Sequence, residues 1–330
     1  MIIDRCVLAP RLIRILPEVV INGPGVINDT ACTAVVGERK FQADTFAALE
    51  QQLADGLYAV FHAGQKAGPE KNYPKRDHRL EKAFACVVPH STTHVTAVFR
   101  GLREEAQQLL VELEGVLVWL PRSTTQDVAL PSIGGPIRLQ LPPVRPVLSP
   151  GFQFVTGSRP VDVAGPLLRV YVHVTDAYHA IGIWQAVLEC LEGACVAYQA
   201  KVLSRTQEYP RRDALVVYLP LACAHADQLI VDAVMGMPGI AEDTSVFAER
   251  LAPGVAKAWE PTDTRPGMSG LSFGQHRAKV LASALLDSVT TGEPRELAVT
   301  KSFVMANIDP GNPALNILRH DLAFTSGGDG

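Results

Sequence analysis

Three short runs of β-branched and aromatic residues, each bounded by chain breakers, predict three strands in the middle of the chain. They cover residues 168–174, 198–203 and 214–219. Between the first two, apolar residues recur at helical spacing over 176–191, which predicts a helix. A strand–helix–strand order makes the first two strands parallel if they share a sheet. We take this unit as the organising part of the fold.

The rest of the chain alternates apolar segments with turns rich in Pro and Gly. The pattern predicts strands at 19–21, 34–36, 84–89, 93–99 and 116–120, and helices at 44–64, 103–114, 224–235 and 277–286. Prolines in 121–160 exclude a long helix there and indicate a boundary between lobes. We therefore expect an α+β protein with a mixed central β-sheet flanked by helices. Its expected parts are an N-terminal α/β lobe (1–155), a core (156–308) and a C-terminal tail (309–330).

Polar side chains on the central strands suggest a binding site. Successive side chains of a strand point to opposite faces, so Arg169, Tyr171 and His173 share one face of the first strand. Lys201 interrupts an otherwise apolar strand, which we expect to neighbour the first strand, and Tyr218 lies on the third. Burying an unpaired ammonium is costly, so Lys201 requires a pocket or an acidic partner.

Further cations extend this candidate site. Arg211 and Arg212 precede the third strand. Ser272 is a plausible cap for the helix that carries His276 and Arg277, and a helix N-terminus with cations favours an anion. The loop with Lys71, Lys75 and Arg76 is a further possible clamp for substrate. Arginine forks match phosphate oxygens, so the cluster suits phosphate; for each of these groups the alternative is a solvated surface charge.

Composition narrows the function. The chain has 330 residues, 47% of them hydrophobic, and a net charge of −4, which argues against non-specific nucleic-acid binding. Its 6 cysteines are scattered, which favours reduced thiols in a cytoplasmic protein. We expect no membrane span, no secretion signal and no metal or other cofactor, because no sequence pattern points to one.

Several of these segments resemble the HopA-type type III effector domain. The resemblance lies in Arg169-x-Tyr171-x-His173, in Lys201, in the run from Tyr209 to Tyr218, and in 247–261 and 272–277. A weaker match covers 57–64, so that the similarity extends over about two-thirds of the chain, from near residue 50 to near residue 290. Each match is weak alone, whereas their order and spacing together are fairly specific.

The resemblance implies a function. Standalone bacterial proteins with this domain occur beside a kinase-like protein in class V lanthipeptide and thioamitide biosynthesis, where a lyase eliminates phosphate from phosphorylated Ser or Thr. Dehydroalanine or dehydrobutyrine results. The site is similar to that of phosphothreonine lyases, which use a Lys base and a His acid, here Lys201 and His173. Those enzymes carry a basic residue two positions before the His, where this chain has Tyr171, so phosphate must be held elsewhere.

The resemblance implies that Tyr171 would assist Lys201 and His173. The phosphate would be bound by Arg169, Arg211, Arg212, His276, Arg277 and Tyr218. The expected partners are a phosphorylated precursor peptide and a kinase, with no nucleic acid and no membrane. A second hypothesis is a non-catalytic subunit that binds phosphopeptides in a kinase complex, with the same cations and no base. A third, an effector acting on host immunity, is disfavoured by the absence of an apparent secretion segment.

Overall fold

The computed structural model describes residues 7–22, 32–65, 76–113, 115–127, 129–145, 148–161 and 165–317. Within these ranges the largest sheet has seven strands in the order β13-β14-β10-β12-β11-β9-β8, and every neighbouring pair is antiparallel. We call it the central sheet. Its strands are β8 (Val144–Arg145), β9 (Phe152–Thr156), β10 (Leu167–Val174), β11 (Gln199–Leu203), β12 (Arg211–Pro220), β13 (Glu249–Ala252) and β14 (Val255–Trp259).

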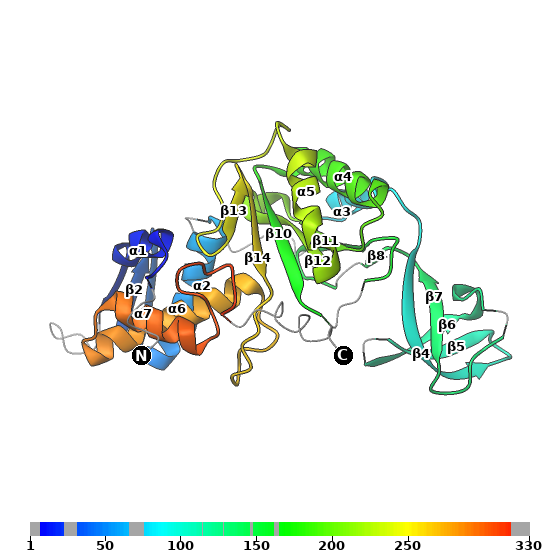
Figure 1. Ribbon diagram of the computed structural model, residues 1–330, viewed down its shortest axis with the longest axis horizontal. Helices are drawn as coiled ribbons and strands as arrows, with labels where there is room; N and C mark the ends of the chain where they lie inside the picture. The colour runs from blue at the N-terminus through cyan, green and yellow to red at the C-terminus, as the bar shows by residue number, and fades with distance from the viewer. Residues whose placement is uncertain are drawn as a thin grey trace, which may run out of the picture.

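Helices cover both faces of the central sheet (Figure 1). One face packs with α3 (His78–Cys86), α4 (Ala177–Gly193) and α5 (Asp227–Val234) through an apolar core that includes Val170, Val172 and Val174. The other face packs with α1 (Pro10–Ile15), α2 (Phe46–Leu57), α6 (Phe273–Thr291) and α7 (Arg295–Met305). The mixed α+β class predicted from the sequence is therefore confirmed.

The start of α6 follows from its sequence. Ser272 caps the helix: its side chain accepts from the Gln275 N–H at 3.4 Å, and the Gln275 side chain accepts from the Ser272 N–H at 2.9 Å. The helix ends at Gly292, whose φ of 73° is left-handed and suits glycine. This cap fixes the N-terminal turn of α6 against the central sheet, where the candidate site lies.

Two smaller sheets precede the central one. β1 (Val19–Asn22), β2 (Cys32–Val36) and β3 (Arg39–Ala43) pack on α2 and belong to the same core as α6 and α7. A second sheet, β4 (Thr93–Arg103), β5 (Gln108–Leu113), β6 (Val116–Pro121) and β7 (Pro136–Leu141), has its own core and projects away from the rest (Figure 1). The expected lobe over 1–155 thus contains two sheets with different cores. Residues 309–317 of the expected tail pack on the core through Trp259 and Arg277.

Two predicted elements are wrong. Residues 104–113 form a turn and strand β5 instead of a helix, because Leu109 and Val111 alternate into the core of the second sheet. Residues 84–86 end helix α3 instead of forming a strand, since Leu80 and Phe84, four positions apart, are buried together. In both cases a tertiary contact decides between two patterns that a short apolar run permits.

Candidate functional site

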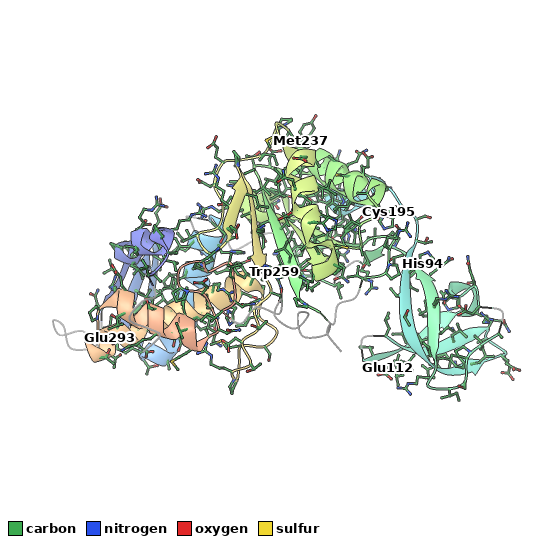
Figure 2. The ribbon with its side chains drawn as sticks, in the orientation of Figure 1. His94, Glu112, Cys195, Met237, Trp259 and Glu293 are labelled. Carbon is green, nitrogen blue, oxygen red and sulfur yellow. The ribbon has the colours of Figure 1, made fainter. Side chains whose placement is uncertain are left out.

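A cavity of about 1100 Å³ opens on the central sheet where the helical layer of α2, α6 and α7 ends. Side chains from β9, β10, β11 and β12 form its floor, and the N-terminal end of α6 and the segment after β14 form its rim. Trp259, labelled in Figure 2, is the last residue of β14 and directly precedes that rim. The residues used below are Phe152, Arg169, Lys201, Tyr218, Glu260 and Ser272.

Lys201 projects from β11 into this cavity. It pairs with Val216 of β12 on one side and Phe154 of β9 on the other, so the backbone holds it in the middle of the sheet. Its Nζ lies 4.5 Å from the centre of the Phe152 ring and 5.9 Å from that of Tyr218. Among the described residues no hydrogen bond or ion pair reaches this ammonium. The predicted pocket for Lys201 is therefore present, without an acidic partner in the described ranges.

Arg169 also lines the cavity, but a carboxylate already holds it. Its Nε donates to Glu260 Oε2, and its Nη2 donates to Glu260 Oε1 at 2.7 Å. The guanidinium also lies 5.0 Å from the centre of the Tyr218 ring. A phosphate that used this fork would have to displace Glu260, whose side chain is 33% exposed.

Tyr171 lies on the same row of the sheet as Lys201, because both pair with Val216 of β12. Its hydroxyl is buried, and no described residue hydrogen-bonds to it. Burial raises the pKa of this phenol above its ordinary value, so it keeps its proton at neutral pH. The ring packs against His62 and Phe273 and is not part of the cavity lining.

His173 faces the same side of the sheet as Tyr171 but lies outside the cavity lining. We predicted that the strand of Lys201 would neighbour the strand of His173. This prediction is wrong, because β12 lies between β10 and β11. The two backbones are thus about 10 Å apart across the sheet, and His173 lies about 7 Å further along its strand than Tyr171. The strands are parallel to each other, as predicted, because each is antiparallel to β12.

The imidazole of His173 is held by the backbone. Its Nδ1 lies 2.8 Å from the carbonyl oxygen of Asp243. A carbonyl only accepts, so Nδ1 carries the hydrogen and Nε2 has the free lone pair. Burial lowers the pKa of His173, opposite to the imidazolium that the predicted acid role demands.

Arg211 is a buried structural cation. It donates to both carboxylate oxygens of Asp213 at 2.8 Å, to the Tyr58 hydroxyl at 3.0 Å and to Glu208 at 3.1 Å. Asp213 is itself buried, and Arg211 is the main cause that holds the pKa of this carboxyl below its usual range against the effect of burial. The structure does not bring Arg211 to the cavity as the prediction required.

His276 and Arg277 also point into the protein. Arg277 is fully buried and donates to Pro313 O at 2.8 Å and Asn316 Oδ1 at 3.2 Å. Its Nη1 lies 2.8 Å from His276 Nδ1, and His276 Nε2 lies 2.9 Å from Asp263. Ser272 lines the cavity, so the start of α6 lies at its rim, but the side chains of His276 and Arg277 turn inward to buried partners.

The remaining predicted cations lie elsewhere. Arg212 donates to the carbonyls of Val60 and Phe61 at 3.2 and 3.3 Å and lies 3.6 Å from Asp243. Arg76 pairs with Glu81 at the start of α3, at 3.0 and 2.6 Å. Lys71 and Lys75 fall outside the described residues. None of these described cations lines the cavity.

Two residues that sequence reasoning missed complete the site. Glu260 closes the fork of Arg169, and Phe152 supports Lys201. Phe152 carries a signal in the sequence, because Phe152, Gln153 and Phe154 alternate apolar and polar residues as a strand does, beside the Pro-rich segment. Glu260 has none, since its partner is 91 residues away.

No group of His, Cys, Asp and Glu side chains suited to a metal ion occurs in the described part of the chain. A search for helices long and apolar enough to span a bilayer, over the same residues, finds none. What the site offers chemically is a lysine ammonium over aromatic rings, a paired arginine and a capped helix N-terminus.

The fold and site define an α+β protein with a partly cationic cavity on its central sheet. The HopA1 effector protein family model matches residues 144–315, from β8 to the segment after α7, and the chain therefore belongs to this family. No curated protein matches the chain.

Among solved structures, the effector protein from Pseudomonas syringae pv. tomato strain DC3000 is similar, with a TM-score of 0.46 and 14% identity over 82% of this chain and 95% of that one. The effector protein from Pseudomonas syringae pv. syringae strain 61 has a TM-score of 0.46 and 15% identity over 82% and 97%.

Proposed function

We propose that this protein is a lyase that eliminates phosphate from phosphoserine or phosphothreonine in a precursor peptide. The observation that carries the proposal is the Lys201 ammonium, which lies in a cavity over aromatic rings without an ion pair among the described residues. An amine in such a place is available to a ligand and, once it has lost its proton, to a Cα–H bond. The cavity of about 1100 Å³ accommodates a phosphorylated side chain with adjoining backbone.

In the proposed reaction Lys201 Nζ removes the Cα proton, and the electrons of that bond form a double bond between Cα and Cβ. The Cβ–O bond breaks with its electron pair on the phosphate oxygen, which then takes a proton. Serine gives dehydroalanine and threonine gives dehydrobutyrine. Arg169, released from Glu260, and the backbone N–H groups at the start of α6 would neutralise the phosphate.

The proton for the leaving phosphate comes from His173, the predicted acid, or from Tyr171, which was predicted only to assist. Tyr171 lies on the row of Lys201 and keeps its proton at neutral pH. His173 lies further along the strand, and burial disfavours its imidazolium form. Neither side chain lines the cavity, and a raised pKa makes the Tyr171 phenol a weak acid, so we retain both residues as candidate donors. Either residue would have to approach the leaving oxygen after substrate binds.

As the resemblance implies, we further propose that a partner kinase phosphorylates the peptide beforehand. A second candidate function is a non-catalytic subunit that binds phosphopeptides for such a kinase. It is favoured by one observation: His173, the predicted acid, does not share the cavity with Lys201. The side chain of Lys201 would then serve as a phosphate ligand.

One experiment separates the two functions. Purified protein is incubated with a synthetic phosphothreonine peptide, and free phosphate and peptide mass are followed, with the unphosphorylated peptide as control. Release of phosphate together with loss of the mass of phosphoric acid supports the lyase. Tight binding with unchanged mass supports the binding subunit, and neither binding nor mass change contradicts both.

A further inference from the structure

Three arginines line a second pocket, apart from the cavity that holds Lys201. Arg11 and Arg14 come from α1 and Arg250 from β13, and the pocket that they line has a volume of about 420 Å³. We call it the arginine pocket. The two cavities share no lining residue.

The charges of the arginine pocket are unpaired in the part of the chain that the structure describes. Arg11 donates to Thr244 Oγ1 at 2.9 Å and to the Ala248 carbonyl at 3.2 Å. Arg14 and Arg250 each donate to one backbone carbonyl, at 3.4 Å. No described carboxylate forms an ion pair with any of the three.

Repulsion among these cations is a cost of the native fold. Burial lowers the pKa of Arg11, the positive charges of Arg212, Arg250 and Arg14 lower it further, and Asp243 acts in the opposite direction. The pocket also contains Glu249, which accepts a hydrogen bond from Asn312 at 3.4 Å and leaves a positive balance. Guanidiniums stay charged, so an anion from outside would relieve this repulsion.

The arginine pocket and the cavity are connected by one short segment of the chain and lie on the same sheet. Gly311, Asn312 and Pro313 line the pocket, and three residues later Asn316 Nδ2 donates at 2.9 Å to the carbonyl of Glu260, on the cavity rim. Four strand intervals separate β13 from β11, which is about 19 Å. An extended peptide needs about six residues to cover that distance, and more to pass around α2 and α6, which cover the sheet between the two sites.

We propose that the arginine pocket binds carboxylate side chains of the same peptide whose phosphorylated residue enters the cavity. The inference rests on the proposed function, because it takes the substrate to be a peptide. Arginine forks bind carboxylates in pairs of hydrogen bonds, and the pocket has room for more than one acidic side chain. The pocket would thus select peptides with acidic residues more than about six positions from the site of elimination.

Four labelled peptides test the proposal: phosphorylated or not at one threonine, and with two Glu or two Gln more than about six residues from it. Fluorescence anisotropy at low ionic strength gives their dissociation constants. We expect the Glu peptides to bind about tenfold more tightly than the Gln peptides. The variant Arg14→Gln/Arg250→Gln should remove this preference, and both side chains are exposed, so folding is not at risk.

The matched control Arg79→Gln/Arg138→Gln makes the same charge change at exposed arginines on α3 and β7 and should keep the preference. Equal binding of Glu and Gln peptides by the native protein would overturn the proposal. So would displacement of the Glu peptide by an equal concentration of inorganic phosphate, which would define a small-anion site. The unphosphorylated pair reports on the pocket even if no elimination occurs, so the two proposals can fail separately.

Discussion

Lys201 and Arg211 are cations on adjacent strands of one sheet, and their surroundings differ completely. Lys201 faces an open cavity, and its described contacts are aromatic rings. Arg211 is buried in a network with Asp213, Glu208 and Tyr58. Arg277, fully buried on α6, is also hydrogen-bonded inside the protein, but to neutral groups: the Pro313 carbonyl and Asn316 Oδ1.

The difference teaches that a cation indicates ligand binding only when the fold leaves it unpaired. A buried guanidinium with a bidentate carboxylate has its hydrogen bonds satisfied and is part of the structure. An ammonium without a partner destabilises the folded state, and a bound anionic ligand can offset that loss. Loss of Arg211 should therefore affect stability, and loss of Lys201 should affect activity.

The largest effect is expected for Lys201→Ala. Removing the base should reduce the rate of phosphate elimination roughly 1,000-fold or more, because no other described lysine lines the cavity. The melting temperature should change little, since no ion pair is lost. Phosphate release in single-turnover assays measures the first, and circular dichroism the second.

The control for that variant is Lys257→Ala. Lys257 lies on β14 of the same sheet and pairs with Asp227 at 2.9 Å. It should keep its elimination rate and lose a little stability. Full activity of Lys201→Ala, or an equal loss in both variants, would remove Lys201 from the mechanism.

Arg211→Met should show the opposite behaviour. It leaves Asp213 buried without its main partner, which should lower the free energy of unfolding by about 3–5 kcal/mol. Guanidinium denaturation measures this loss. Arg76→Met, at the solvent-accessible pair with Glu81, should lower the free energy of unfolding far less. Equal losses would show that burial does not distinguish these two ion pairs.

Much of the fold could be predicted from the sequence, because local pattern and tertiary structure agree there. The strand at 168–174, the helix after it and the cap at Ser272 all depend on neighbours within a few residues. The hairpin at 104–121 could not be predicted, since its apolar run permits helix or strand until the second sheet forms.

The candidate site was predictable only in part. Strand alternation places Arg169, Tyr171 and His173 on one face of their strand, and only the register of the sheet shows that Lys201 lies on the same face. Alternation does not reveal that β12 separates the two strands, nor that Glu260 and Asp263 hold cations far from them in sequence. One signal was readable: Arg211 and Asp213, two positions apart on a strand, face the same way.

Acid should destabilise the protein through two buried histidines. Burial lowers the pKa of His62 and of His276 to about 4, and for His276 the Arg277 charge adds to this effect. The unfolded chain, with histidine pKa values near about 6.5, takes up protons first, so stability is full above that pH and lost toward pH 4.

As the pH falls across that interval, each of these histidines should lower the free energy of unfolding by about 3 kcal/mol. The steepest slope for one histidine is about 1.4 kcal/mol per pH unit. The geometry agrees for His276: Arg277 only donates, so His276 Nδ1 must accept and stay unprotonated. Unfolding free energies at several pH values give the slope, and His276→Gln should reduce it by about half. An unchanged slope would contradict the assignment.

The smallest effect is expected for a variant that leaves a paired cation, Arg169, without its carboxylate. Glu260→Gln removes the carboxylate that holds Arg169 in the cavity, so Arg169 becomes available to phosphate. In the Lys201→Ala background, which prevents turnover, phosphopeptide affinity should rise about three- to fivefold. Isothermal titration calorimetry measures it, with the unphosphorylated peptide as reference.

Glu293→Gln is the matched control, because Glu293 also pairs with a cation, Lys301, and lies in the helical layer far from the rim that follows Trp259 (Figure 2). It should leave phosphopeptide affinity unchanged. If Glu260→Gln also leaves it unchanged, Arg169 is a structural cation like Arg211. Of the two described cations that line the cavity, Lys201 alone would then be available to bind phosphate, together with the N-terminus of α6.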